Sequence, residues 1–168
     1  MEEPDFAAIR VFNALYGGAV TSKLFLNVRE KLSLCYYASS ACDTRKGILL
    51  VSSGIEAENF HAAKREILAQ LNAVREGDFT DDDLTAARKS VASDLRALTD
   101  SPGALEDFYL SQTLLGLDWS PTELAELCEA VTKEDVLAIA GGVELDAVYF
   151  LHGGADDENG EAEDDAET

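Results

Sequence analysis

The segment from Phe12 to Ser40 restricts the possible folds of this chain more than any other stretch. It reads FNALYGGAVTSKLFLNVREKLSLCYYASS, and Gly17-Gly18 separates two stretches with the apolar spacing of amphipathic helices. The pattern predicts one helix from Pro4 to Tyr16 and a second beginning at Thr21 or Ser22. The second helix has one apolar face, formed by Leu24, Phe25, Val28 and Leu32.

A β-hairpin is predicted directly after these helices. Residues 34–41 are aromatic, small or hydroxylated, and residues 43–47 are typical of a turn. The apolar run from Ile48 to Val51 then supplies the second strand. A further short strand is predicted from Ala147 to Leu151.

The part between the hairpin and that last strand is predicted to be helical. A long amphipathic helix is expected from Ala57 to Arg75, and it ends before Gly77. Four more helix starts follow from capping residues with an acid three positions later or a proline in the first turn. These capping residues are Thr80, Ser101, Ser120 and Thr132.

The predicted order is two helices, a hairpin, a block of helices and a strand. This order indicates an α+β fold in which helices pack on one face of an antiparallel sheet. We expect one domain over residues 1–152, followed by a disordered acidic tail over 153–168. That tail carries eight acids and no base, so it has little apolar surface to bury.

The charge and composition of the chain limit the classes of molecule that it can bind and the compartment in which it is expected. The chain carries 33 acids against 13 bases, a net charge of −20. A surface of this sign repels nucleic acid and anionic membranes, so neither is expected as a partner. No apolar run is long enough for a transmembrane helix, and no secretory signal is expected. Three cysteines without C-x-x-C spacing (Cys35, Cys42, Cys128) favour reduced thiols and a cytoplasmic location.

The usual catalytic motifs do not occur in the sequence. Neither H-x-x-E-H nor H-E-x-x-H is present, and His61 and His152 are the only histidines. Two histidines far apart in the chain do not make the three-ligand set of a catalytic zinc site. We therefore predict no metal or other cofactor in this chain, and no enzyme activity of the chain alone.

Arg29 and Tyr36 are the candidate functional pair. Arg29 falls near the end of the second helix and Tyr36 near the start of the next strand, so a tight connection could bring both to one edge of the sheet. A guanidinium fork and a phenol hydroxyl can together hold a peptide carbonyl. The alternative is structural: an arginine favoured at a helix C-terminus and a tyrosine favoured in a strand.

The same segment resembles a known family. The run GGAVTSKLFLNVREKLSLCYYASS is similar to the glycine-rich loop, the serine/lysine helix and the R-x6-Y segment of C-terminal, non-metal half-domains of pitrilysin/insulinase-type zinc peptidases. These include mitochondrial processing peptidase relatives and inactive bacterial paired members. KGILLVSSGIEAENF continues the likeness, which extends from about Pro4 to His152.

The resemblance implies a clamshell of two α+β units that closes on an extended peptide. The metal-bearing half-domain or paired subunit would supply zinc, and this chain would supply walls, a strand edge and the Arg29–Tyr36 pair. Tyr36 would then donate to the tetrahedral oxyanion and Arg29 would hold a backbone carbonyl. Gly17, Gly18 and Ser22 would contact the peptide.

The chain differs from family half-domains in two respects, and one alternative function is open. Family half-domains begin with a strand before the first helix, which this chain lacks, so we expect a fragment whose sheet is missing that strand. The loop reads Gly-Gly-Ala-Val where relatives often have a third glycine or a serine. The alternative is an inactive scaffold of the same fold with no substrate role.

Overall fold

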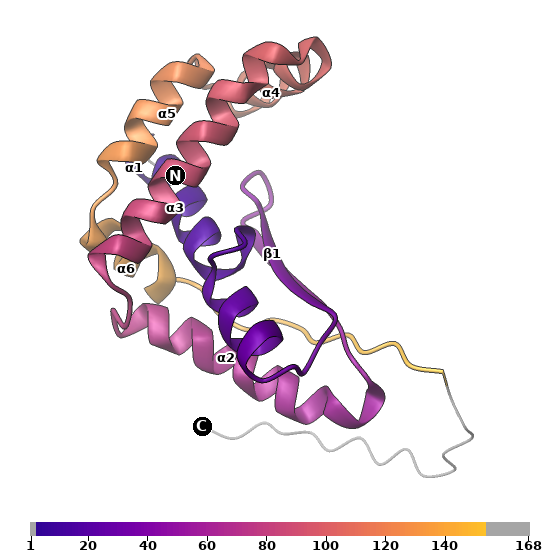
Figure 1. The fold of residues 1–168 in the computed structure, drawn as a ribbon. Helices are drawn as coiled ribbons and strands as arrows, with labels where there is room; N and C mark the ends of the chain where they lie inside the picture. The colour runs from indigo at the N-terminus through magenta and orange to yellow at the C-terminus, as the bar shows by residue number, and fades with distance from the viewer. Residues whose placement is uncertain (1–2, 154–168) are drawn as a thin grey trace.

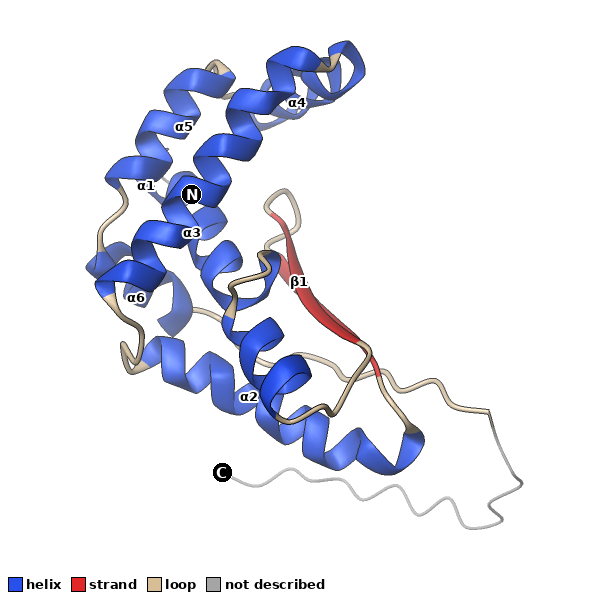
Figure 2. Cartoon of the chain, viewed as in Figure 1, coloured by secondary structure: helices blue, strands red, loops and turns tan. Residues whose placement is uncertain are grey.

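The computed structural model describes residues 3–153 and has the predicted α+β architecture. Two strands form one antiparallel hairpin, and helices make up most of the remainder (Figure 2). The predicted acidic tail lies outside the described residues except for Gly153. The elements in chain order are α1 (Glu3–Asn13), η1 (Ala14–Gly18), η2 (Leu24–Lys31), β1 (Tyr37–Asp43), β2 (Ile48–Gly54), η3 (Ala57–Asn59), α2 (Phe60–Arg75), α3 (Asp81–Ala97), η4 (Leu98–Asp100), α4 (Pro102–Leu115), α5 (Pro121–Ala130) and α6 (Lys133–Gly141).

The first helix lies at the centre of the molecule. α1 contacts α3, α5, α6 and β1, so it joins the helical layer to the hairpin (Figure 1). Its apolar side is fully buried at Val11 and Phe12, and the Phe12 ring stacks on Tyr16 with 5.9 Å between centroids. The helix continues into the π-helical turn η1 instead of ending at Tyr16. Burial of this stripe explains why the apolar spacing predicted the element correctly.

The hairpin pairs Tyr37 with Gly54 at one end and Asp43 with Ile48 at the other. The strand was predicted to start at Leu34, but it starts at Tyr37. The reason is the end of η2, where the Leu34 N–H donates to the Val28 carbonyl at 3.1 Å and closes the helix. A backbone group used in this way is not available to a strand ladder.

Three of the four predicted helix caps are complete capping boxes. Thr80 with Asp83, Ser120 with Glu123, and Thr132 with Asp135 each show both reciprocal hydrogen bonds. Ser101 precedes α4 as predicted but makes no capping hydrogen bond through its side chain. Proline at the first position of α4 starts the helix there without that hydrogen bond.

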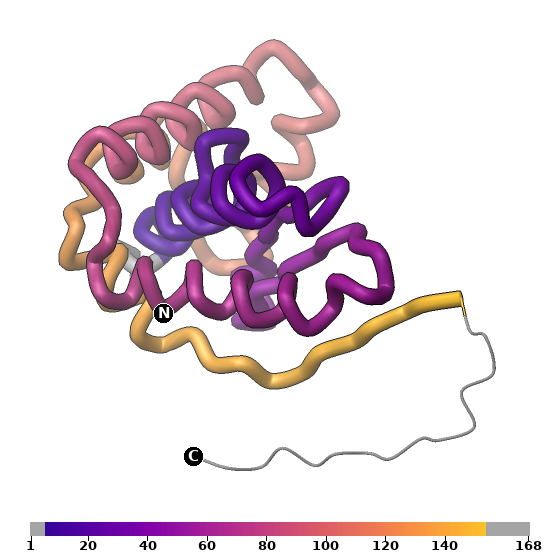
Figure 3. The backbone as a smooth tube through the Cα atoms, turned by 60° about the horizontal axis from the view of Figure 1, so that its bottom comes forward, coloured from indigo at the N-terminus to yellow at the C-terminus, as the bar shows by residue number. Residues whose placement is uncertain are grey.

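The predicted strand from Ala147 to Leu151 is wrong. This segment is extended but pairs with no strand among residues 3–153, and 86% of Tyr149 is exposed. It runs along α2 in the opposite direction (Figure 3). Before the segment, Arg75 of α2 donates to the carbonyls of Ala140 in α6 and of Val143, and within it Phe150 stacks on Phe60 of α2 at 4.3 Å. The Phe150–Phe60 contact therefore places the segment against α2, and no strand among residues 3–153 offers it the neighbouring backbone that a strand needs.

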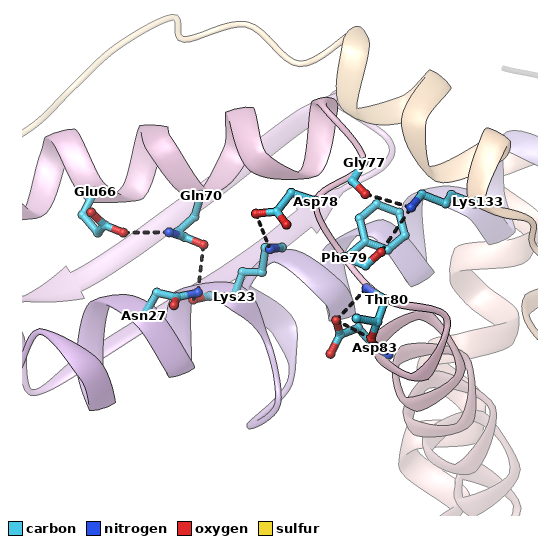
Figure 4. A network of polar contacts seen from close by, with 10 residues as sticks. All are labelled: Lys23, Asn27, Glu66, Gln70, Gly77, Asp78, Phe79, Thr80, Asp83 and Lys133. Carbon is cyan, nitrogen blue, oxygen red and sulfur yellow. Dashed lines mark hydrogen bonds and ion pairs between the residues drawn. The ribbon is translucent and has the colours of Figure 1, made fainter.

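A polar junction connects the loop between α2 and α3 to the rest of the fold (Figure 4). Lys133 donates from Nζ to the carbonyls of Gly77 at 2.8 Å and Phe79 at 3.1 Å, and it lies over the Phe79 ring. Gly77 has a φ of 75°, a conformation that glycine adopts without strain. A single lysine of α6 thus anchors the turn that orients α2 against α3.

A second set of contacts in the same view connects η2 to α2. Asn27 donates from Nδ2 to Gln70 Oε1 at 2.9 Å, and Gln70 donates to Glu66 at 2.7 Å. Lys23 lies 3.8 Å from the carboxylate of Asp78. These contacts hold η2, the helix that carries Arg29, against α2 and the turn that follows it.

Candidate functional site

Arg29 lies in the last turn of η2 with its side chain partly exposed. Its guanidinium stacks over the Phe25 ring at 4.7 Å, and its Nη1 lies 3.6 Å from the Glu30 carboxylate. Ring stacking leaves the edge of a guanidinium, where its N–H donors are, available for other groups. With 41% of the side chain exposed, Arg29 can present donors to a ligand at the surface.

Tyr36 lies one residue before β1 and is 73% exposed. Its backbone N–H donates to the Gly54 carbonyl at 2.8 Å, so this hydrogen bond to the end of β2 fixes the main chain of the residue. Its hydroxyl donates to Glu56 Oε1 at 2.7 Å. This hydrogen bond, together with the charge of Glu56, raises the pKa of Tyr36, because the phenolate form would face a carboxylate.

The connection between the two residues is tight, as predicted. Ser33 has a φ of 50°, and its N–H donates to the Arg29 carbonyl at 3.1 Å. This left-handed residue ends η2 and turns the chain toward the hairpin. Among the described residues, however, each side chain of the pair contacts its own partners: Phe25 and Glu30 for Arg29, and Glu56 for Tyr36.

Glu56 is a candidate site residue that nothing in the sequence pointed to. It follows β2, twenty positions beyond Tyr36, and only the hairpin register brings the two together. No local spacing rule covers such a pair. Knowing the register would have placed Tyr36 beside the end of β2, and a carboxylate there is a natural acceptor for its hydroxyl.

Close packing requires glycine at position 17 and leaves little room for a side chain at position 18. A Cβ on Gly17 would lie 2.6 Å from Ser40 Oγ and 2.8 Å from Ser40 N, and one on Gly18 would lie 2.6 Å from Asn13 Nδ2. Neither glycine has a positive φ, so they do not act as a left-handed helix cap. Gly17 is buried and Gly18 is exposed.

Ser22 is 1% exposed and accepts a hydrogen bond on its hydroxyl from the Phe25 N–H at 3.3 Å. It therefore helps to start η2, which then carries Arg29. Of the three predicted loop contacts, Gly18 is the one that reaches the surface.

Both histidines of the chain lie in one aromatic cluster at the start of α2. His61 lies against Phe60 and His152 against Phe150, at 5.2 and 5.1 Å between ring centroids, and Phe60 stacks on Phe150. The two histidines are far apart in the sequence, but the fold brings them into the same cluster. Within the described part of the chain, no group of three or more His, Cys, Asp or Glu side chains could hold a metal ion.

The hairpin has one face away from the helices. On that face, Tyr37, Ile48 and Leu50 are 52%, 52% and 61% exposed. β1 also packs against η1 and η2, whereas β2 has extensive contact only with β1 within residues 3–153. The outer edge of β2 thus offers backbone hydrogen-bonding groups beside an apolar strand surface.

Comparison with known proteins places this arrangement in a family. The family model described as "Peptidase M16 inactive domain" matches residues 1–91. A "Probable inactive metalloprotease YmfF" of Bacillus subtilis is 38% identical over 151 residues, which are 90% of this chain and 35% of that protein. An "Uncharacterized zinc protease SCO5738" of Streptomyces coelicolor is 29% identical over 141 residues, which are 81% of this chain and 30% of that protein.

Solved structures agree on the fold. A conserved protein from Enterococcus faecalis V583 superposes with a TM-score of 0.74 and 33% identity, over 82% of this chain and 32% of that chain. A protease from Helicobacter pylori superposes with a TM-score of 0.69 and 18% identity, over 83% of this chain and 34% of that one.

The chain therefore spans about a third of the length of the relatives that it matches. No helix among residues 3–153 is both long and apolar enough to cross a membrane. The likeness to the non-metal half-domain of zinc metallopeptidases, first indicated by residues 17–40, is confirmed. The chain belongs to the peptidase M16 inactive-domain family.

Proposed function

We propose that this chain pairs with a metal-bearing half-domain or subunit of its own family, completes the chamber around that metal and binds extended peptide there. The zinc would belong to the partner. The non-catalytic character of the chain is supported by the family model, which describes an inactive domain, and by its similarity to a probable inactive metalloprotease. The peptide and chamber roles are our inference.

The observation that carries the proposal is the outer edge of β2. A strand edge recognises an extended peptide through main-chain hydrogen bonds, whatever its sequence, and neighbouring apolar side chains add preference. Ile48 and Leu50 are exposed on this strand, and Tyr37 lies on the same face of β1. A peptide added here would extend the two-stranded sheet by one strand.

Arg29 and Tyr36 would act at one end of that peptide. In the proposed role, the Arg29 guanidinium holds a substrate carbonyl and the Tyr36 hydroxyl donates to the oxyanion formed at the partner's metal. Tyr36 must leave Glu56 to donate elsewhere, so the present hydrogen bond is that of a resting arrangement. Gly18 would contact the peptide, while the buried Gly17 and Ser22 would shape the loop beneath it.

The edge-binding part can be tested by hydrogen exchange on the complex. The chain would be mixed with a purified family member that carries H-x-x-E-H and an unfolded peptide substrate, with the metal removed to prevent cleavage. We expect slower exchange at the outward-facing amides of β2, between Ile48 and Gly54, only when both partner and peptide are present. Unchanged β2 amides, despite protection elsewhere, would contradict peptide binding at this edge.

The alternative function is an inactive scaffold that retains the fold and the partner but has no contact with substrate. The family description as an inactive domain fits this function as well. It predicts a stable complex, seen by size-exclusion chromatography, in which protection from exchange does not depend on peptide. Sequencing the neighbouring genes for an H-x-x-E-H protein would identify the partner to use.

We also propose a cytoplasmic location and no nucleic-acid partner. All three cysteines are free thiols in the structure, and burial raises the pKa of Cys42 and raises that of Cys128 to about 11. Protonated, buried thiols suit a reducing compartment. Cell fractionation followed by thiol alkylation would test this location, and oxidised cysteines in the isolated protein would contradict it.

A further inference from the structure

A pocket of about 290 Å³ lies between α1, the end of β1 and α3, away from Arg29 and Tyr36. Arg10 of α1 lines it, together with Asn13 and Gly18 from the same region of the chain. Thr44 and Ser90 contribute hydroxyl groups from the hairpin turn and from α3. Gly18 is the one lining residue that the proposed peptide role also uses, and Arg10, Asn13, Thr44 and Ser90 have no part in that role.

The Arg10 guanidinium has no counter-charge among the residues that the structure describes. No carboxylate there lies within 4 Å of it, and its Nε is buried without a hydrogen-bond partner. Its surroundings on the protein side are the Phe6 ring at 5.1 Å and the thiols of Cys42 and Cys128. Burial lowers the pKa of Arg10, yet an arginine stays charged at neutral pH.

A partly desolvated charge of this kind favours an opposite charge in any space beside it. Asn13 adds a second donor, because its Oδ1 already accepts from Ser40 Oγ at 2.8 Å, which leaves its amide nitrogen against Gly18 at the pocket wall. Asp94 is the one acid that lines the pocket, and it is exposed. Its charge opposes an anion at the mouth but does not neutralise Arg10 in the interior.

We propose that this pocket binds a small carboxylate, with Arg10 as the charged donor and Asn13, Thr44 and Ser90 as neutral partners. The guanidinium fork matches the two oxygens of a carboxylate, and a lysine could not reproduce that geometry. The volume admits a ligand the size of a short-chain organic acid, since a water molecule takes up about 30 Å³. Inorganic phosphate is an oxyanion like a carboxylate, so it is tested alongside acetate.

The binding can be followed by NMR on the full chain. Because Arg10 Nε is shielded from solvent, its Hε should exchange slowly enough to give a resolved signal near neutral pH. The protein would be titrated with sodium acetate, with inorganic phosphate and with sodium chloride, all at the same ionic strength. We expect saturable shifts at Arg10 Hε and the Thr44 amide with acetate, and no saturable shift with chloride.

Three variants make the test specific. Arg10→Gln should abolish the acetate shifts, and Arg45→Gln, an exposed arginine of the hairpin turn, should leave them unchanged. Asp94→Asn should tighten acetate binding about two- to fivefold, because it removes a like charge from the mouth of the pocket. Asp94 is exposed, so this variant should fold even if Arg10→Gln does not.

Saturable acetate binding that is lost in Arg10→Gln and strengthened in Asp94→Asn supports the proposal. Saturation with phosphate alone would assign the site to phosphate and overturn the carboxylate assignment. Equal shifts with chloride would show screening and would overturn the site altogether, as would acetate binding that is unaffected by both Arg10→Gln and Asp94→Asn.

Discussion

The phenol of Tyr36 is held by a residue across the hairpin, and the guanidinium of Arg29 is held by neighbours within its own helix. Glu56 accepts the Tyr36 hydroxyl, and Phe25 supports the Arg29 guanidinium. These contacts orient exposed side chains that would otherwise be free to rotate. They also mean that any ligand must compete with Glu56 for the Tyr36 proton.

Replacing Glu56 by glutamine should lower the pKa of Tyr36 toward its ordinary value. The carboxylate disfavours the phenolate, first through the hydrogen bond and then through its charge, so a neutral amide removes most of the effect. The ¹³Cζ resonance of Tyr36, followed by NMR against pH, reports this change. Glu58→Gln, two residues away, is the matched control and should leave the titration of Tyr36 in place; an unchanged Tyr36 pKa in Glu56→Gln would show that the hydrogen bond is not formed in solution.

Replacing Gly17 by alanine should destabilise the fold by about 1–3 kcal/mol, the usual range for overpacking a tight site. The new Cβ would meet Ser40 Oγ, Ser40 N and Leu24 Cδ1 at 2.6 to 2.8 Å, and the backbone atom cannot move away freely. Urea unfolding measures the change. Gly103→Ala serves as control, because a Cβ there meets nothing within 4 Å, and it should be neutral or slightly stabilising. Equal stability of the two variants would contradict the close approach of η1 to β1.

The elements of this fold differ in how far local sequence determines them. Thr80, Ser120 and Thr132 were predicted as caps because a capping box depends on residues three positions apart, and all three form. The strand predicted from Ala147 to Leu151 failed because pairing depends on a distant backbone, and Phe150 instead packs on Phe60 of α2. Glu56 and the Arg10 pocket were missed for the same reason, since tertiary contacts create both.

Thr80→Ala should destabilise the protein by about 1 kcal/mol, through loss of the hydrogen bond that its hydroxyl accepts from the Asp83 N–H. Ser101→Ala is the matched control at the start of α4, where the serine side chain makes no capping hydrogen bond. It should lower the free energy of unfolding much less than Thr80→Ala does. Urea unfolding of both variants measures the two losses of stability. A cost at Ser101 as large as that at Thr80 would mean that the observed capping geometry does not set helix stability here.

The capping carboxylates should make stability fall at acid pH. Hydrogen bonds from the Thr80 and Thr132 N–H groups are the main causes that lower the pKa values of Asp83 and Asp135. A lowered folded-state pKa contributes stability above the ordinary value of 3.8, and that contribution is lost as pH falls through the lowered pKa.

The double variant Asp83→Asn, Asp135→Asn should therefore be less stable than the parent at pH 6, and the difference should shrink below pH 4. Urea midpoints measured from pH 6 to pH 3 test this. A difference that stays constant over that range would show that neither carboxylate has a lowered pKa in the folded state.

At the scale of the whole molecule, residues 3–153 combine a layer of helices with a small two-stranded sheet. α1 joins three helices to the hairpin, while β2 keeps an outer edge without extensive contact within residues 3–153. The chain spans about a third of the length of its relatives. The family was predictable from residues 17–40, because that segment combines several residue types in one register, and the fold class was predictable from the order of helices and hairpin along the chain.

We propose above all that Arg29 and Tyr36 belong to half of an active site whose metal lies in a partner. The most direct measurement is peptide cleavage by a purified H-x-x-E-H family member with and without this chain, comparing wild type with Tyr36→Phe and Arg29→Ala. Tyr149→Phe and Arg45→Ala, exposed residues elsewhere, are matched controls. We predict that cleavage depends on the chain. For Tyr36→Phe, kcat should fall by about 10²–10³, the usual effect of losing one oxyanion donor. Cleavage should also fall for Arg29→Ala. Full cleavage with both site variants, in complexes that form normally, would contradict the account.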